Sequence, residues 1–413
     1  MEAILNEAAL AQWKGSQTPE ETIIKQDLST WLSSQFTASS SPALRCAILE
    51  LVRIIARDES GVNALLSDTL TKCVLDASGL PAICEAERTP EERLEAIKCL
   101  INALHRSDRC RGLFMEKGGD SGLVSALDAI DREGPETRYL LVRLAFLVAA
   151  TIPKLQRTWR ADPVVTRALC RIAASFASDE RSADEALKTL FPLYRCCIDD
   201  AKNIELSAID SENLKTCVLL IRNVPKGSEI LQNTIHLVAC LTLDVDIVCP
   251  KVEDDSPLSY GGRAMGVPQI VMDDLSDRLA VTTEPEALEL LGTSMNFLNT
   301  LCAVCKEARR FCRLKILPPL KAAEVERPPE QGDTMRNRLV RVMQSNSRVR
   351  TIAAELAFVL CKRSVNRLIK YTGFGHSAGL LANSGLLGRI NEGRRASDSE
   401  DSETDDYVEV EDQ

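Results

Sequence analysis

Cysteine is the residue type in this chain whose spacing most directly suggests a chemistry. Cys302 and Cys305 form a Cys-x-x-Cys motif, Cys312 follows it, and Cys196 and Cys197 are adjacent in an earlier segment. Such thiols could bind zinc, but finger-type zinc sites need a second ligand pair at matched spacing. None of the three histidines lies near the motif in the sequence. Since the motif falls in an apolar helical stretch, we expect buried thiols and no bound metal.

Motifs that would indicate an enzyme do not occur in the sequence. There is no phosphate-binding P-loop, no GxGxxG after a strand, and no GxSxG, HExxH or kinase signature. With three histidines, acid–base catalysis would fall mostly to carboxylates, and no carboxylate pair stands out from solvated helix faces. We therefore expect no catalytic residues, no cofactor and a function that depends on non-covalent binding.

The negative charge of the chain is concentrated at one end. The formal net charge is −10, and residues 397–413 contain nine acidic residues and no basic one. The rest of the chain is therefore nearly neutral. A protein whose main partner is nucleic acid needs a basic surface to contact phosphates. The charge distribution therefore argues against nucleic acid as the partner.

No targeting or membrane segment is evident. The first residues lack the basic start and apolar run of a signal peptide. The most apolar stretch, 140–151, is too short to span a bilayer and contains Arg143. We expect a cytoplasmic protein without a membrane span, which can be recruited to the cell cortex, and whose fifteen cysteines stay reduced.

Apolar residues recur at helical spacing along most of the chain, as Leu44, Ile48, Leu51 and Ile55 do. Helix-breaking residues separate these segments, and Thr89-Pro90-Glu91-Glu92 has the pattern of a helix start. Two or three helices in every 40–47 residues is the armadillo/HEAT period. We predict an all-α, armadillo/HEAT-like, right-handed superhelical solenoid of about nine repeats over 1–387. Loop insertions are expected near 249–267 and 324–333, and a disordered acidic tail over 388–413.

Polar side chains recur on consecutive predicted helices beside their apolar stripes. In a solenoid, equivalent helices line one concave surface. Such residues can be a solvated face with local pairs such as Glu50–Arg53. Alternatively they form a groove for an extended peptide or for a helix end that carries a carboxylate, with Arg53 and Arg57 as an anion-binding pair on one helix face. The candidate binding residues are Arg53, Arg57, Asn102, Tyr139, Arg143 and Phe146.

Several segments resemble the synembryn family, the resistance-to-inhibitors-of-cholinesterase type of guanine nucleotide exchange factor and chaperone for heterotrimeric G-protein α subunits. The similarity is broad and is strongest at 308–319 (Ala-Arg-Arg-Phe-Cys-Arg-Leu-Lys-Ile-Leu-Pro-Pro). It continues at 335–341, 353–360 and 369–375 (Ile-Lys-Tyr-Thr-Gly-Phe-Gly). The earlier segments 45–58, 95–102 and 141–148 are similar to successive repeat helices of that family.

The resemblance implies a concave face that holds the C-terminal helix of a GDP-bound or nucleotide-free Gα subunit, promotes GDP release and retains the empty form. Three features depart from the family pattern: Pro192, which we expect to kink its helix, His236 in place of an asparagine, and an end just after the acidic segment. The alternative function is an armadillo-type peptide-binding scaffold or adaptor without exchange activity.

The acidic tail contains two candidate phosphorylation sites. Ser397 and Ser402 each have an acidic residue three positions later, the pattern favoured by acidophilic kinases of the casein kinase 2 type. The tail can be a solubilising appendage. The resemblance favours a phosphorylated tail that docks on the last repeats through arginine forks. The residues predicted to bind the phosphates are Arg309, Arg310, Arg313, Arg367 and Lys370.

Overall fold

The computed structural model describes residues 19–386 apart from 58–61, 82–87, 198–207, 254–255, 283–287, 322–323, 325 and 384. Its contacts divide the chain into two units, Met1–Asn203 (unit 1) and Ile204–Gln413 (unit 2). Each unit is described by itself below. The predicted acidic tail over 388–413, with Ser397 and Ser402, lies outside the described residues.

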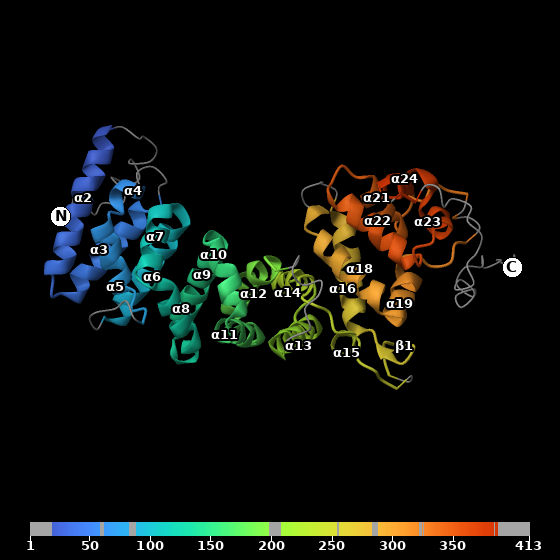
Figure 1. Cartoon of the computed structure of the whole chain (residues 1–413), viewed down its shortest axis with the longest axis horizontal. Coiled ribbons are helices and arrows are strands. Elements are labelled where there is room, and N and C mark those ends of the chain that lie inside the picture. Colours follow the sequence, from blue (N-terminus) through green and yellow to red (C-terminus); the bar gives the residue numbers. More distant parts are fainter. Residues whose placement is uncertain are drawn as a thin grey trace. The chain divides into compact units, whose positions relative to one another are not determined.

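Unit 1 consists of helices joined by short connections (Figure 1). In chain order they are α2 (Pro19–Ala38), α3 (Pro42–Ile55), α4 (Val62–Leu65), α5 (Asp68–Ala77), α6 (Pro90–Arg106), α7 (Asp108–Glu116), α8 (Gly119–Asp128), the 3₁₀ turn η1 (Ile130–Arg132), α9 (Pro135–Thr151), α10 (Pro153–Ala161), α11 (Pro163–Ala174) and α12 (Glu180–Arg195).

Every third long helix of unit 1 occupies an equivalent place. The helices α3, α6, α9 and α12 begin at Pro42, Pro90, Pro135 and Glu180, and each packs on the next. Helices α5, α8 and α11 form the backing layer, since α5 contacts α6, α8 contacts α9 and α11 contacts α12. The interval of 45–48 residues between equivalent helices is that of three-helix armadillo-type repeats. The apolar core between the layers is therefore shared between neighbouring repeats.

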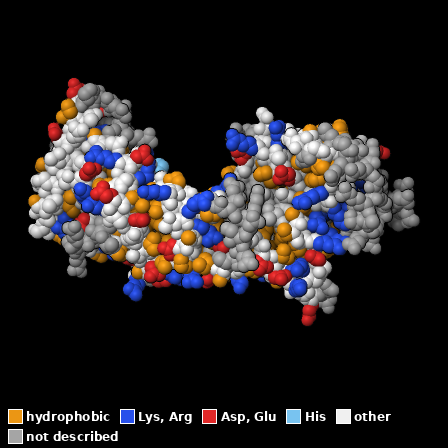
Figure 2. Space-filling view, in the orientation of Figure 1, with side chains coloured by type: hydrophobic (Ala, Val, Ile, Leu, Met, Phe, Trp, Pro, Cys, Tyr) orange, Lys and Arg blue, Asp and Glu red, His pale blue; other side chains and the backbone are white. Residues whose placement is uncertain are grey.

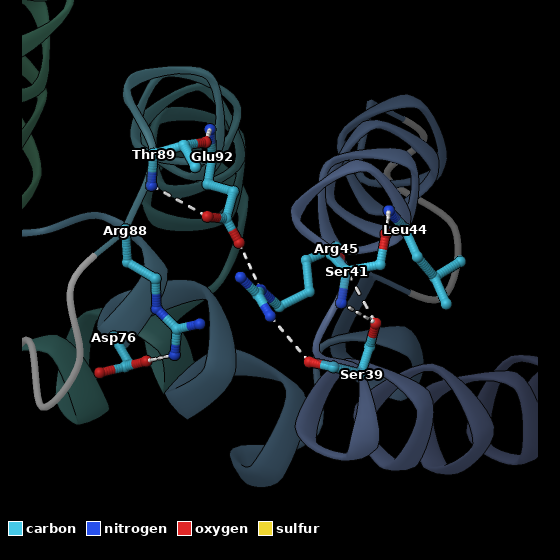
Figure 3. A network of polar contacts seen from close by, with 8 residues as sticks. All are labelled: Ser39, Ser41, Leu44, Arg45, Asp76, Arg88, Thr89 and Glu92. Carbon is cyan, nitrogen blue, oxygen red and sulfur yellow. Dashed lines mark hydrogen bonds and ion pairs between the residues drawn. The ribbon is translucent and has the colours of Figure 1, made fainter.

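Local sequence determines where these helices start. Thr89 and Glu92 form a reciprocal capping box at the start of α6, with Pro90 as the first helical residue, which confirms the predicted start. Glu92 is fully buried and also pairs with Arg45 of α3, which in turn donates to the carbonyl oxygen of Ser39 at 2.7 Å (Figure 3). The Arg45–Glu92 ion pair thus joins the residue that follows α2 to the first turns of α3 and α6.

Unit 2 is also mainly helical and carries one small hairpin (Figure 1). Its elements are α13 (Ala208–Asn223), α14 (Glu229–Val238), α15 (Val245–Val248), β1 (Ser259–Tyr260), β2 (Arg263–Ala264), α16 (Gly266–Val281), α18 (Gly292–Val304), α19 (Lys306–Ile316), α21 (Met335–Gln344), α22 (Val349–Leu360), α23 (Val365–Thr372) and α24 (Phe374–Asn383). Helix α18 lies at its centre and packs on α16, α19 and α22.

The predicted insertion near 249–267 contains a structure that sequence reasoning missed. Strands β1 and β2 pair antiparallel, with Tyr260 opposite Arg263 across a Gly261-Gly262 turn. Both glycines have positive φ, at 59° and 75°, which favours a two-residue hairpin turn. Tyr260 packs against Phe311 of α19 with ring centroids 6.1 Å apart. The insertion is therefore folded back onto unit 2.

The predicted all-α, armadillo-like class is confirmed by these helices and their packing. Helix α12 continues from Glu180 to Arg195 through Pro192, so the proline does not end it. Among the described residues, no single helix has the length and apolar composition of a membrane span. Helices α9 and α10 meet those criteria only jointly, as a pair bent by 118°.

Candidate binding face of the stacked helices

The first half of the candidate face joins α3 to α6. Arg53 of α3 donates from Nε to Glu95 of α6 at 2.8 Å, and its backbone carbonyl accepts from Asn102 Nδ2 at 3.1 Å. The local pair Arg53–Glu50, which the interpretation of this face as solvated predicts, also forms, at 3.2 Å. Lys98 contacts Glu95 at 2.8 Å from within α6. Arg53 and Asn102 therefore hold neighbouring repeats together.

The second half joins α9 to α12. Tyr139, Arg143 and Phe146 are half-buried and share one face of α9, as their spacing of four and three residues requires. Arg143 donates to Glu185 of α12 at 2.8 Å. The Arg143 side chain has 44% of its surface exposed to solvent, whereas the Glu185 side chain has 5% exposed. Arg181 of α12 lies over the Tyr139 ring, 3.9 Å from its centroid.

Seven side chains of α3, α6, α9 and α12 are either partly exposed or paired with a charge on the next of these helices. We call them the polar row: Arg53, Glu95, Asn102, Tyr139, Arg143, Phe146 and Glu185. Helix α6 packs on α9 between the two halves. The structure thus places five of the six predicted binding residues on successive stacked helices.

Arg57, the sixth, is placed differently from the prediction. Helix α3 ends at Ile55, so Arg57 lies in the turn beyond it and does not share a helix face with Arg53. Its side chain is exposed, and no ion pair of Arg57 occurs within the ranges that the structure describes. The expected arginine pair on one helix is therefore not formed, because Arg53 lies in α3 and Arg57 lies beyond its end.

The polar row is balanced in charge. Burial alone would raise the pKa of Glu95, but hydrogen bonds from Lys98 and Arg53 outweigh it, so the pKa is lowered and the carboxylate stays ionised. Figure 2 shows acidic and basic side chains beside one another over unit 1. The second carboxylate oxygen of Glu185, Oε2, is buried and has no hydrogen-bond partner among the described residues. An occupant of this face thus meets the partly exposed guanidinium of Arg143, whereas the Glu185 carboxylate that pairs with it is buried.

Glu95, Glu185 and Arg181 were missed by sequence reasoning. Each lies on a helix that the sequence predicts, but its partner comes from the neighbouring repeat, 42 to 45 residues away. A signal was present, because Arg53–Glu95 and Arg143–Glu185 have the same separation of 42 residues. Such a repeated opposite-charge spacing near the armadillo period could have indicated cross-repeat pairs.

The predicted thiols are confirmed as buried at Cys302, Cys305 and Cys312, whereas Cys196 and Cys197 are half-buried, with their sulfurs 3.4 Å apart. Cys302 belongs to α18, but Cys305 ends that helix and caps α19. Within the described part of the chain, no group of three or more histidine, cysteine, aspartate or glutamate residues is arranged to hold a metal ion.

The five predicted phosphate-binding residues differ in accessibility. Arg313 and Arg367 are buried, with 4% and 9% of their surface exposed. Arg313 faces Tyr371, with its guanidinium 5.6 Å from the ring centroid. Arg309 donates to the Cys302 carbonyl oxygen at 2.9 Å. Arg310 and Lys370 are half-exposed, so they are the members of this set, together with Arg309, that a docking segment reaches at the surface.

Fold and polar row together define an all-helical repeat protein whose stacked helices present charged and aromatic side chains, a class that binds other proteins on such faces. The family described as guanine nucleotide exchange factor synembryn matches residues 48–413. This chain belongs to that family.

Two relatives illustrate the similarity. This chain is 33% identical to "Chaperone ric-8" of Caenorhabditis elegans, over 88% of this chain and 74% of the relative. It is 31% identical to "Chaperone Ric-8A" of Xenopus tropicalis, over 89% of this chain and 74% of the relative.

Solved structures give weaker likenesses. A designed armadillo repeat protein is 13% identical, covers 66% of this chain and 98% of its own length, and has a TM-score of 0.43. An engineered protein that covers 94% of this chain and 99% of its own length is 14% identical and reaches 0.47. The description of the fold above rests on the helix packing of the chain itself.

Proposed function

We propose that this chain is a chaperone and guanine nucleotide exchange factor for heterotrimeric G-protein α subunits and acts without covalent chemistry. Membership of the synembryn family supports this, as do the relatives named as chaperones. The proposal includes a cytoplasmic location with recruitment to the cell cortex, where Gα subunits act.

The polar row is the proposed binding site for the C-terminal helix of Gα. The observation that carries this is Arg143, a half-exposed guanidinium held in place by the buried carboxylate of Glu185. A held arginine loses less conformational freedom when it binds a carboxylate or a helix end. Tyr139 and Phe146, on the same face of α9, supply apolar contact area beside it.

Exchange follows from binding by thermodynamic coupling. If the chain binds nucleotide-free Gα more tightly than GDP-bound Gα, then its binding weakens GDP affinity by the same factor. Holding the C-terminal helix of Gα in the row would thus promote GDP release and protect the empty form until GTP binds. No residue of this chain needs to touch the nucleotide.

The test compares Arg53→Ala/Arg143→Ala with the matched control Arg171→Ala. Arg171 of α11 is similarly exposed (48%) and also pairs with a carboxylate, Asp131 at 3.0 Å, but lies outside the row. Binding of a Gα C-terminal peptide is measured by fluorescence anisotropy, and GDP release from whole Gα by loss of a fluorescent nucleotide. We expect the double variant to bind at least tenfold more weakly, because lost partners of bound carboxylates cost about 2–5 kcal/mol.

The outcomes separate the proposal from its alternative. An equal loss in Arg171→Ala, or no loss in the double variant, would remove the polar row from the site. Normal peptide binding with no acceleration of GDP release would instead identify the chain as a peptide-binding scaffold. Circular dichroism of each variant confirms that the helices are intact.

We further propose that an acidophilic kinase of the casein kinase 2 type phosphorylates Ser397 and Ser402, and that the phosphates dock through Arg309, Arg310 and Lys370. Phosphate adds about −1.5 to −2 charges and strong acceptors for guanidinium groups. Treated wild type should then melt at a higher temperature and release GDP from Gα faster than a treated Ser397→Ala/Ser402→Ala variant. Equal values for both would leave the tail as a solubilising segment.

A further inference from the structure

The stacked helices α6, α9 and α12 carry a basic residue at the same position. Lys98, Arg143 and Lys188 each stand eight residues after the first residue of their helix. Because α6 packs on α9 and α9 packs on α12, residues at equivalent positions form one line across the stack. We call these three side chains the cation column. Of the three, only Arg143 is also a member of the polar row.

Each cation of the column lies closer to solvent than the carboxylate with which it pairs. Lys98 and Arg143 have 33% and 44% of their side-chain surface exposed, whereas their partners Glu95 and Glu185 have 20% and 5%. Lys188 is 32% exposed and also pairs with Glu185, at 3.7 Å. A partner that approaches this face therefore meets the ammonium and guanidinium groups before it meets the carboxylates that position them.

A line of apolar side chains runs beside the cation column. Three residues after each cation stands a half-buried apolar residue, and we call this set the apolar column: Ile101, Phe146 and Phe191. Residues three apart lie on the same side of a helix, so the two columns adjoin on each of the three helices. A charged line beside a line of partly exposed apolar side chains is the kind of surface on which an amphipathic helix docks.

The spacing of the cation column favours a helical occupant over an extended one. The axes of packed helices are about 8–10 Å apart, which sets the interval between successive cations. In an α-helix, seven residues advance about 10 Å and bring the side chain back to the same face. In an extended chain, three residues advance about 10 Å, but their side chains point to opposite faces. A helix can therefore present one carboxylate to every cation, whereas an extended segment cannot.

We propose that the cation and apolar columns determine which partner segments this site accepts, namely an amphipathic helix whose carboxylates recur every seven residues beside an apolar stripe. The inference rests on the proposed function in taking this face as the partner-binding site, and it adds the charge pattern that the partner must carry. A helix with the same charges on its other faces leaves the cations paired only with their own carboxylates, so it is discriminated against.

The line of charges changes sign on α3, and this gives the bound helix a direction. Glu50 stands eight residues after Pro42, the first residue of α3, and its side chain is 59% exposed. A carboxylate above α3 would be repelled by Glu50, whereas a basic side chain would pair with it. The accepted helix therefore places its acidic residues over α6, α9 and α12 and its basic end over α3.

The experiment uses two synthetic helical peptides of identical composition. In the first, glutamates recur every seven residues beside a leucine stripe, and in the second the same glutamates lie on the opposite face of the helix. Fluorescence anisotropy measures the binding of each to the whole chain, and circular dichroism confirms equal helicity of the peptides. We expect the first peptide to bind about tenfold more tightly, with a preference that shrinks as salt is raised.

Lys98→Ala/Lys188→Ala tests the two lysines of the column. The preference for the first peptide should fall below about threefold, because each exposed ion pair contributes a few-fold to affinity. The matched control is Arg171→Ala/Lys226→Ala. It removes two cations that also pair with carboxylates, at 3.0 and 3.1 Å, but that lie outside the column. The control should keep the full preference.

Three results would overturn the proposal: equal binding of the two peptides to wild type, an unchanged preference in Lys98→Ala/Lys188→Ala, or an equal loss in the control. Loss of Gα peptide binding in Arg53→Ala/Arg143→Ala would still support the proposed function in each case. Normal Gα peptide binding in that variant, with the peptide preference intact, would instead remove the proposed function and keep the charge pattern. If the double lysine variant loses helix content, Lys98→Ala replaces it, since Lys98 pairs with Glu95 of its own helix.

Discussion

The arginines of the polar row in unit 1 are partly exposed and lie beside carboxylates of the next helix, as Arg143 does with Glu185. In unit 2, Arg313, Arg336 and Arg367 are buried instead, with 4%, 3% and 9% of their surface exposed. Arg313 faces the ring of Tyr371, and Arg367 lies one turn before that tyrosine on α23. Burial lowers the pKa of Arg336, although Glu324 and Tyr371 oppose the shift.

The difference shows that one residue type has two physical roles in this chain. A half-exposed arginine in an ion pair contributes little to stability and remains available to a partner. A buried arginine packed on a ring contributes through its apolar stem and cation–π contact and is withdrawn from solvent. We therefore expect substitutions in the polar row to change binding, and substitutions in the buried set to change folding.

The largest effect is expected for Arg313→Ala. The substitution removes the contact with Tyr371 and leaves a cavity, so the free energy of unfolding should fall by about 2–3 kcal/mol. Arg143→Ala is the matched variant in unit 1 and should cost less than about 1 kcal/mol. Urea unfolding, combined with hydrogen exchange of α23 for Arg313→Ala and of α9 for Arg143→Ala, measures the two losses. Similar losses in the two variants would contradict the distinction between the units.

Glu185→Gln should sharpen the role of the polar row. The variant removes the negative charge that competes for Arg143, while the glutamine oxygen can still accept its hydrogen bond, so the guanidinium stays in place and binds an acidic peptide more strongly. We expect binding of an acidic Gα C-terminal peptide to tighten by up to about tenfold and to become more sensitive to salt. Anisotropy titrations at two salt concentrations provide the measurement. Weaker binding would show that Glu185 itself contacts the occupant.

Acid should destabilise unit 1 through its paired carboxylates. Burial would raise the pKa of Glu92, but hydrogen bonds from Arg45 and from the Thr89 amide lower it, and Glu95 is lowered similarly. A carboxyl whose folded pKa is lowered stabilises the fold above its ordinary pKa, here 4.5, and this stability is lost as the pH falls through the folded value. The protection factors of the α3 and α6 amides, which correct for the intrinsic exchange rate at each pH, should therefore fall below about pH 4.5, and less so in Glu92→Gln relative to its own value at pH 7.

The smallest effect is expected for Arg181→Ala. Its guanidinium lies over Tyr139, but its side chain is 63% exposed, so the loss of unfolding free energy should be about 0.5–1 kcal/mol. Thermal unfolding followed by circular dichroism would detect the change. A loss above about 2 kcal/mol would show that exposed pairs beside the polar row hold the repeats together more strongly than we infer.

Helix starts, the repeat period and the polar character of the α3, α6 and α9 faces could be predicted from the sequence, because they depend on local patterns. Thr89 with Glu92 is one example, since a capping box needs only neighbouring residues. The sequence placed Arg57 on the same helix as Arg53, but α3 ends two residues before it. Helix ends are difficult to predict because the interactions that extend or end the last turn differ little in free energy.

Contacts between repeats could not be predicted in the same way. Nothing near Arg313 in the sequence indicates burial, because Tyr371 lies 58 residues later. The contact of Tyr260 with Phe311 likewise depends on how the insertion folds back onto α19. These features require the three-dimensional register of the helices, which a single sequence leaves open.

The equal chain separation of the two row pairs has a consequence for which partners fit. Arg53–Glu95 and Arg143–Glu185 each span 42 residues, and the second pair repeats the first two armadillo units later. The face therefore offers the same arginine–glutamate pair twice. An occupant that binds at one pair is held near the other at high effective concentration, provided that it is long enough to reach both pairs. The length of the bound segment, as much as its residues, would then decide which partners are retained.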